Sequence, residues 1–177
     1  MHLRYSIPGK MYWINNFLSY QTYKDIHSAI IKQRKKLKLH SAQGLWSEEL
    51  TAFLEAPLRV EVNDYQPFEK LKTLTKFNPY LKLDDITKIS TIIHYMKKGS
   101  GINWHNDGSW KYGATYYLNN RWDKKWGGEF MFTNENGHGF IPIEKNSLII
   151  VKSPIDHKVN PVLISHMPRL TIQMFIK

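Results

Sequence analysis

The segment with the clearest capacity for chemistry is residues 102–110, INWHNDGSW, which places a histidine and an aspartate two positions apart. In an extended strand, residues i and i+2 point to the same face. His105 and Asp107 would then direct an imidazole nitrogen and a carboxylate oxygen toward one point, with Asn106 turned away. Such a pair can supply two metal ligands, form a hydrogen-bonded pair, or have no chemical role, and the pair alone does not decide among these.

A third ligand would have to come from a later strand, and three histidines are candidates. His138 lies in NENGHG, a glycine-rich hairpin tip, and His166 stands just before Pro168 and Arg169 in another expected turn. His157 follows the apolar run SLIIV and opens a new extended run, HKVNPV, so the backbone can hold its side chain rigidly. We therefore favour His157 and keep the other two histidines as alternatives.

Two histidines and one carboxylate form the facial triad of non-haem Fe(II) oxygenases. Three protein ligands leave three open positions, two for a chelating co-substrate and one for dioxygen. The H-x-D pair is common by chance, but a histidine about 50 residues later makes the pattern more specific. A zinc or nickel site in a cupin-like protein without oxidative activity would use the same ligands, so that alternative stays open.

The final segment, RLTIQMFIK, adds a cation to this candidate site. Alternation puts Arg169, Thr171 and Gln173 on one face, and the opposite face is entirely apolar. This pattern suggests that Arg169 points into a lined cavity. A guanidinium binds carboxylate bidentately and keeps its proton. Arg169, 12 residues after His157, could therefore hold the far carboxylate of a metal-chelating dicarboxylate. A surface arginine on an edge strand is the alternative.

The elements that would position these residues change character near Ile86. Before it, the sequence indicates helices with a few strands, and the expected helices cover 19–40, 47–57 and 67–77. The first has Ser19 as its N-cap and ends in the basic run KQRKK, expected to be solvated. Its apolar residues recur at helical spacing and are Tyr23, Ile26, Ile30 and Leu37.

After Ile86, eight short apolar or alternating runs are separated by glycine and asparagine turns, a pattern typical of an antiparallel sandwich or barrel. The runs cover 88–96, 102–107, 112–119, 127–133, 139–143, 147–152, 157–163 and 169–176. Eight strands suffice for a jelly roll with the amino-terminal helices packed on one sheet. We expect a mainly β fold with N-terminal helices, formed by a single domain over 1–177, in which 1–85 is mostly helical support and 86–177 is the β core.

Composition limits the possible classes. A chain of 177 residues with 42% hydrophobic and 14% aromatic residues can bury a sizeable core. The absence of cysteine excludes disulfides, thiolate ligands and a cysteine nucleophile. Without a secretory signal or an apolar run of about 18 residues, we expect a cytoplasmic protein with no membrane association. The net charge of +10 suits acidic partners, although a solvated basic surface is the more common explanation of such a charge.

The second half resembles the Fe(II)/2-oxoglutarate-dependent dioxygenases, in their prolyl hydroxylase-like branch. The matching motifs are HYMKKGSGINWHND, YYLNNRWDKKWGGEF, NSLIIVKSPIDHKVNPV and RLTIQMF, and ATYYLNNRWDKKWGGE is similar to the oxygen-sensing prolyl hydroxylases. The resemblance covers roughly 86–177. It implies a double-stranded β-helix, a jelly-roll variant, with His105, Asp107 and His157 as iron ligands. It also implies that Arg169 binds the C5 carboxylate of 2-oxoglutarate.

The resemblance further implies that two tyrosines, Tyr95 and Tyr117, contact 2-oxoglutarate. Alternation places Thr115 on the face of Tyr117, and Phe130 is expected to line the same pocket. Gln173 stands where close relatives can carry a threonine, so the carboxylate contacts can be rearranged.

Two neighbouring polar residues are not expected to act in this pocket. His94 alternates to the face opposite Tyr95, which assigns it a structural role. Glu129 is expected to point outward, opposite to Phe130.

The activity that the resemblance implies is hydroxylation with release of succinate and CO2. It requires Fe(II), 2-oxoglutarate and O2, with ascorbate as a reductant. Related halogenases have a small residue at the position of Asp107, so its carboxylate favours a hydroxylase. Peptidyl proline, in a peptide or protein that can be acidic, is the first choice of substrate. A free amino acid or other small molecule is second.

Nucleic acid is a weaker candidate, because DNA-repair members carry a second arginine six residues after the first, where this chain has Phe175.

For substrate contacts we expect Trp110, Arg121 and Trp122 at the mouth of the site, with Trp104 and Trp126 nearby. These aromatic residues could stack on a proline ring or belong to the core.

Overall fold

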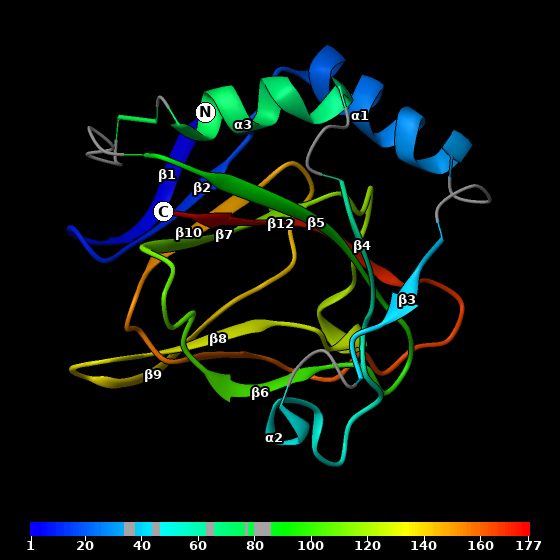
Figure 1. Cartoon of the computed structure of the whole chain (residues 1–177), viewed down its shortest axis with the longest axis vertical. Coiled ribbons are helices and arrows are strands. Elements are labelled where there is room, and N and C mark those ends of the chain that lie inside the picture. The colour runs from blue at the N-terminus through cyan, green and yellow to red at the C-terminus, as the bar shows by residue number, and fades with distance from the viewer. Residues whose placement is uncertain (34–37, 44–46, 63–65, 77, 80–85) are drawn as a thin grey trace.

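The computed structural model describes residues 1–33, 38–43, 47–62, 66–76, 78–79 and 86–177. Two antiparallel sheets face each other, and helices cover the outer face of the larger one (Figure 1). The eight-stranded sheet has the order β1-β2-β10-β7-β12-β5-β4-β3, and the four-stranded sheet has the order β6-β11-β8-β9. The mainly β, jelly-roll fold expected from the sequence is therefore confirmed.

The strands of the larger sheet are β1 (His2–Ile7), β2 (Met11–Asn15), β3 (His40–Ser41), β4 (Leu58–Glu61), β5 (Ile89–Met96), β7 (Tyr112–Tyr117), β10 (Leu148–Lys152) and β12 (Arg169–Ile176). Those of the smaller sheet are β6 (Ile102–His105), β8 (Phe130–Asn134), β9 (Gly137–Ile141) and β11 (His157–Val159). All eight strands expected after Ile86 are present. Strands from the first half of the chain form both edges of the larger sheet.

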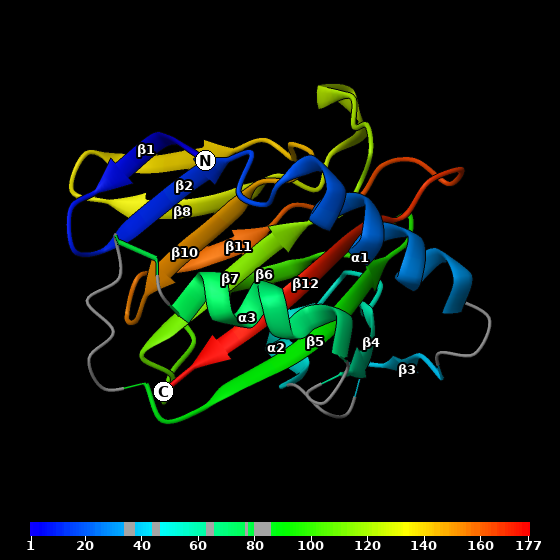
Figure 2. The ribbon, with the colours of Figure 1, turned by 90° about the horizontal axis from the view of Figure 1, so that it is seen from above.

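The helices are α1 (Tyr20–Gln33), α2 (Glu48–Thr51) and α3 (Glu69–Lys76), with 3-10 turns η1 (Gln66–Phe68) and η2 (Lys124–Trp126). Figure 2 shows α1 and α3 lying across the larger sheet. In the described part of the chain, no helix combines the length and apolar character needed to cross a membrane.

The first expected helix begins where the sequence indicates. The Ser19 side chain accepts a hydrogen bond from the Thr22 backbone N–H at 3.2 Å. The apolar residues of its buried face, Tyr23, Ile26 and Ile30, pack against the larger sheet. Leu37 and most of the KQRKK run lie outside the described residues.

The helix expected over 47–57 is shorter than predicted, because α2 ends at Thr51. Phe53 adopts a left-handed backbone conformation, with φ of 64°, which no continuing α-helix can contain. The chain turns there, and the Glu55 N–H donates to the Gly99 carbonyl at 3.0 Å. This contact brings the segment beside the loop between β5 and β6.

The alternation predicted for the last strand is confirmed by burial. Ile172, Met174 and Ile176 are fully buried in the core between the larger sheet and the helices. Arg169 and Thr171 are buried on the opposite face, which looks toward the smaller sheet. The larger sheet therefore separates an apolar core beneath the helices from a more polar space between the two sheets.

One buried asparagine links the segment before α1 to the β core by hydrogen bonds. Asn146, with φ of 55°, accepts from the Leu18 N–H at 3.0 Å and donates to the Leu18 carbonyl at 2.8 Å. The Tyr116 hydroxyl of β7 donates to the same side-chain oxygen at 2.8 Å. A left-handed backbone at a non-glycine residue is most often tolerated by asparagine or aspartate.

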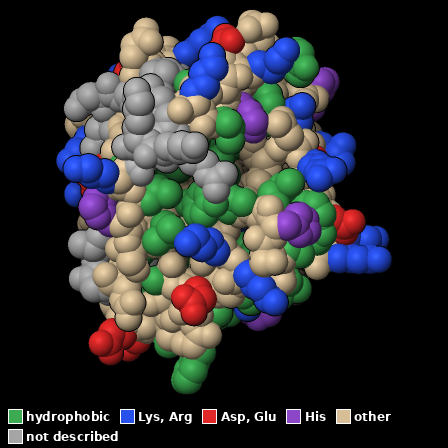
Figure 3. Space-filling model, turned by 90° about the vertical axis from the view of Figure 1, so that its right-hand side faces the viewer, with side chains coloured by type: hydrophobic (Ala, Val, Ile, Leu, Met, Phe, Trp, Pro, Cys, Tyr) green, Lys and Arg blue, Asp and Glu red, His purple; other side chains and the backbone are tan. Residues whose placement is uncertain are grey.

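The excess of positive charge is spread over the surface in the view that Figure 3 gives. Lys and Arg side chains there surround a hydrophobic area and are interrupted by acidic and histidine side chains. Among the described residues visible in this view, the basic side chains do not line up in a continuous track of the kind that follows a nucleic-acid backbone.

Candidate metal site and the adjoining cavity

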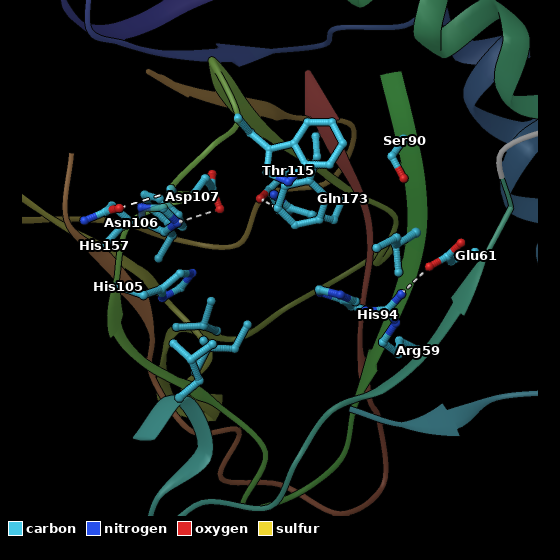
Figure 4. Close-up of a pocket in the computed structure, with 18 residues that line it drawn as sticks. Arg59, Glu61, Ser90, His94, His105, Asn106, Asp107, Thr115, His157 and Gln173 are labelled. Carbon is cyan, nitrogen blue, oxygen red and sulfur yellow. Dashed lines mark hydrogen bonds and ion pairs between the residues drawn. The ribbon is translucent and has the colours of Figure 1, made fainter. Parts of the chain in front are cut away.

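Two neighbouring strands of the smaller sheet bring the candidate metal ligands together. His157 on β11 is the register partner of His105 on β6, and their ring centroids are 4.4 Å apart. Asp107 follows β6, and its Oδ1 is 3.9 Å from the His157 Nε2 (Figure 4). One potential ligand atom from each of the three residues lies within 4.8 Å of the others. The convergence expected from the H-x-D pattern and His157 is thus present.

The backbone fixes which nitrogen each histidine can offer to a metal. The Nδ1 of His105 lies 2.8 Å from the Asn103 carbonyl, and the Nδ1 of His157 lies 3.0 Å from the Ile155 carbonyl. A carbonyl oxygen can only accept, so each neutral ring carries its proton on Nδ1 and keeps a lone pair on Nε2. Such hydrogen bonds orient metal-binding histidines.

Burial also favours the neutral form of one of these rings. Loss of solvation, followed by the nearby His157, lowers the pKa of His105 below its usual value, although Asp107 opposes the shift. A neutral ring is the form that binds a metal, so protons compete less at this position.

The absence of a side chain at Gly113 makes room for the Asp107 carboxylate. A Cβ added at this position of β7 would overlap the Asp107 Oδ2. Glycine therefore allows the larger sheet to approach the carboxylate closely.

A cavity of about 450 Å³ adjoins the cluster, between the two sheets. The larger sheet supplies the wall opposite the histidines with Thr115 of β7 and Gln173 of β12, whose side chains hydrogen-bond at 2.5 Å. Phe130 also lines the cavity and stacks on His157 at 5.2 Å between ring centroids. The places expected for Thr115, Gln173 and Phe130 agree with the structure.

Arg169 is a buried cation on the same face of β12 as Gln173, with only 1% of its surface exposed. Its Nε donates to the Gly128 carbonyl at 3.0 Å, and its Nη2 donates to the Tyr117 hydroxyl at 3.2 Å. Its Nη1 lies 3.4 Å from the Met96 sulfur. Among the described residues, no carboxylate forms an ion pair with Arg169. A buried guanidinium in this state suits an anionic ligand.

Tyr117 can contribute to the same anion site. Burial raises the pKa of its hydroxyl, an effect that Arg169 opposes, so the group stays protonated at ordinary pH. Because the hydroxyl oxygen accepts from Arg169, its proton remains available to a bound carboxylate.

The expectation for Tyr95 is wrong, and so is the face assigned to His94. In the pairing of β5 with β12, His94 lies opposite Thr171 and Tyr95 lies opposite Leu170. His94 consequently faces the cavity, whereas Tyr95 lines a separate hollow of about 280 Å³ on the helix side. Alternation predicts that neighbouring residues of a strand lie on opposite faces, but it does not tell which of the two faces is inward.

Two of the expected substrate contacts are also wrong. Trp110 does line the cavity, beside Phe175 at 5.6 Å. Arg121 and Trp122 instead line a different hollow near the start of α1. The Trp122 indole N–H donates to the Gly127 carbonyl at 2.8 Å, which fixes the ring within its own loop. Neighbouring aromatics in the sequence therefore do not form one cluster at the mouth.

The alternative histidines lie elsewhere. His138 packs against the exposed Trp104, with ring centroids 5.2 Å apart, and His166 packs edge-on against Trp126 at 5.1 Å. Neither belongs to the three-residue cluster.

Sequence reasoning missed two charged residues in the cavity wall, Arg59 and Glu61 of β4. They stand two positions apart, so they share a face by the same rule that identified His105 and Asp107. The signal was present, but β4 has only four residues and lies in a region dominated by helical patterns.

The fold and this donor set are those of a non-haem oxygenase, and comparison with known families identifies which one. The family model described as the 2OG-Fe(II) oxygenase superfamily matches residues 90–177, which contain all the strands from β6 to β12 and nearly all of β5. Through these residues the chain belongs to the 2OG-Fe(II) oxygenase superfamily, and it is a 2-oxoglutarate- and Fe(II)-dependent oxygenase. This membership favours the oxygenase over a non-oxidative cupin-like protein.

Solved structures of prolyl hydroxylases have a similar fold. A prolyl-4-hydroxylase from Pseudomonas putida matches with a TM-score of 0.73 and 14% identity, covering 95% of this chain and 92% of that one. A prolyl hydroxylase from Trichoplax adhaerens, in complex with a hypoxia inducible factor peptide fragment, matches with a TM-score of 0.74 and 18% identity, covering 94% and 83%.

A viral collagen prolyl hydroxylase from Paramecium Bursaria Chlorella virus-1, solved with 2OG, matches with a TM-score of 0.67 and 16% identity, covering 94% of this chain and 95% of that one. At such identities the likeness concerns the fold alone. No curated protein sequence matches this chain.

The first prediction concerns the third ligand. His157→Ala should lower the affinity for Fe(II) by more than about 100-fold, because loss of a ligand exceeds the 10–100-fold effect of its supporting partners. Metal content of the purified variants, measured by mass spectrometry, tests this. His138→Ala and His166→Ala are the controls and should retain full metal content. The assignment is wrong if either control loses the metal while His157→Ala retains it.

The second prediction concerns the space beside Asp107. Gly113→Ala should weaken metal binding about tenfold, because the added methyl group displaces the carboxylate. In an Asp107→Ala background the same change should have little further effect, since the overlapping atoms are gone. Metal titrations of the two single variants and the double variant test this coupling, and additive effects would contradict it.

Proposed function

We propose that the protein is a 2-oxoglutarate-dependent Fe(II) hydroxylase acting on a proline residue of a peptide. One atom of O2 becomes the hydroxyl group of the product, and the other enters succinate as 2-oxoglutarate loses CO2. The observation that carries the proposal is Arg169, a buried cation without a carboxylate partner in the described chain, in the same fold as the histidine and aspartate cluster.

In this proposal, His105, Asp107 and His157 hold the iron. The two rings offer Nε2 because their Nδ1 protons are engaged by backbone carbonyls. The Asp107 carboxylate would provide one negative charge to the bound metal. The bound iron would activate dioxygen, and the protein would fix the positions and the charges of the groups around it.

The co-substrate is held by residues of the larger sheet. Arg169 and the Tyr117 hydroxyl would bind the C5 carboxylate of 2-oxoglutarate, and Thr115 and Gln173 offer polar groups along its length. Phe130, stacked on His157, excludes water from that side of the cluster. In such a dry space, the attraction between guanidinium and carboxylate is stronger than in water.

A prolyl substrate is supported by the fold and by one aromatic side chain. The Trichoplax enzyme of similar fold was solved with a peptide fragment. Trp110 lines the cavity and offers an indole face on which a pyrrolidine ring could stack. Ascorbate would serve as the reductant.

A second candidate substrate is a free amino acid. The Arg59–Glu61 pair in the cavity wall favours it, since two opposite charges suit a zwitterion.

The proposed activity is tested by supplying the protein with Fe(II), 2-oxoglutarate, ascorbate and a proline-containing peptide. Succinate should form only in the presence of O2, and the peptide should gain the mass of one oxygen atom. Slow succinate formation without peptide is also expected, because the ligand cluster is preassembled. Folded, iron-loaded protein that forms no oxygen-dependent succinate contradicts the proposal.

The third prediction separates Arg169 from the metal ligands. Arg169→Ala should weaken 2-oxoglutarate binding by 100-fold or more, corresponding to about 3–5 kcal/mol for an unpaired buried charge, while metal content stays nearly intact. Arg169→Lys should rescue only partly, because lysine lacks the planar fork. Anaerobic titration with 2-oxoglutarate, followed by visible absorbance of the Fe(II)-loaded protein, measures both. Unchanged affinity in Arg169→Ala would place the carboxylate elsewhere, with Arg59, which lines the cavity, the next candidate.

A further inference from the structure

An arginine and a glutamate face the cavity from the wall opposite the metal cluster. β4 pairs with β5 so that Arg59 lies beside His94 and Glu61 lies beside Ile92. All four line the cavity, and Figure 4 shows Arg59 and Glu61 across the space from His105. The Arg59 Nη2 donates to the Glu61 Oε1 at 2.6 Å. A charged pair therefore borders the space in which a substrate would lie.

The two members of this pair differ in their freedom to move. The Arg59 side chain is 15% exposed, whereas the Glu61 side chain is 58% exposed. Glu61 can turn into water at small cost, because an exposed ion pair contributes little stability. Arg59 remains packed in the wall. The glutamate is consequently the replaceable partner, and the arginine is the fixed one.

Arg59 also differs from Arg169 in what it can reach. Arg169 is fully buried and already donates to Gly128 and Tyr117. Among the described residues that line the cavity, Arg59 is the only lysine or arginine. Its hydrogen bond to Glu61 uses Nη2, so further N–H groups of the guanidinium can bind a carboxylate bidentately. The two arginines thus suit two different anions.

We propose that Arg59 is a specificity-determining residue that binds a carboxylate of the primary substrate in exchange for Glu61. The inference rests on the proposed function, because it assigns Arg169 to 2-oxoglutarate and leaves the cavity for the substrate. The carboxylate has two possible sources. It is the α-carboxylate of a free amino acid, or it belongs to an acidic residue next to the target proline of a peptide.

Glu61 distinguishes these sources. A free amino acid also carries an ammonium group, for which Glu61 is a partner, so Glu61→Gln should weaken its binding. An internal peptide segment has no ammonium group at this place. For such a peptide, Glu61→Gln should strengthen binding, because the substrate no longer competes with Glu61 for Arg59.

The test is calorimetric titration of protein loaded with Mn(II) and 2-oxoglutarate, with two pairs of probes. One pair is L-proline and L-prolinamide, and the other is N-acetyl-Pro-Glu-amide and N-acetyl-Pro-Gln-amide. In the wild-type protein, the acidic member of at least one pair should bind about tenfold more tightly than its neutral counterpart. Arg59→Gln should abolish that preference, and Arg59→Lys should retain part of it.

A matched control lies outside the cavity. Lys72 of α3 pairs with Glu69 at 2.8 Å, with side-chain exposures of 15% and 57% that resemble those of the Arg59 pair. Lys72→Gln removes one positive charge of similar burial and should leave the preference unchanged. Melting temperatures of all variants establish that they are folded.

Two outcomes overturn the inference: a wild-type protein that binds neither acidic probe better than its neutral counterpart, or a preference that survives in Arg59→Gln. The titration needs no turnover, so it is independent of the succinate assay. Arg59-dependent binding without succinate formation would support the inference and reject the hydroxylase. Succinate formation without a carboxylate preference would do the reverse.

Discussion

The whole site depends on one cross-strand pair, His105 opposite His157. The two residues are far apart in the chain, and only the antiparallel pairing of β6 with β11 brings their rings to 4.4 Å. Each ring is then fixed by a hydrogen bond from Nδ1 to a carbonyl two residues before it in the chain. Register sets the spacing of the ligands, and the local backbone sets their tautomer.

The larger sheet completes the site because its two faces are chemically different. Alternate residues of β12 place Ile172 and Met174 in the core under the helices, and Arg169 and Gln173 toward the smaller sheet. The apolar face holds the strand in place with the burial of several large side chains. This anchoring allows the other face to carry a buried guanidinium that would be costly on a less constrained strand.

Periodicity made the fold and the ligand cluster predictable, and its limits explain the errors. The eight strands, the His105–Asp107 pair and the inward face of Arg169 follow from a period of two. Tyr95 was misassigned because alternation gives the relation between residues of one strand but not which face is inward. Arg121 and Trp122 were misassigned because proximity in sequence within a loop does not imply a common pocket.

Charge balance connects the residues that sequence reasoning found with those that it missed. Asp107 and Glu61 provide two negative charges, and Arg59 and Arg169 provide two positive ones. His94 adds none, because burial, together with Arg169 and Arg59, lowers its pKa to about 3. A divalent metal and a dianionic co-substrate then cancel each other. A substrate carboxylate adds a negative charge to this neutral set, and Glu61 is the acidic residue in the cavity wall exposed enough to turn away from Arg59. In the proposed exchange, the substrate carboxylate takes the place of Glu61 beside Arg59.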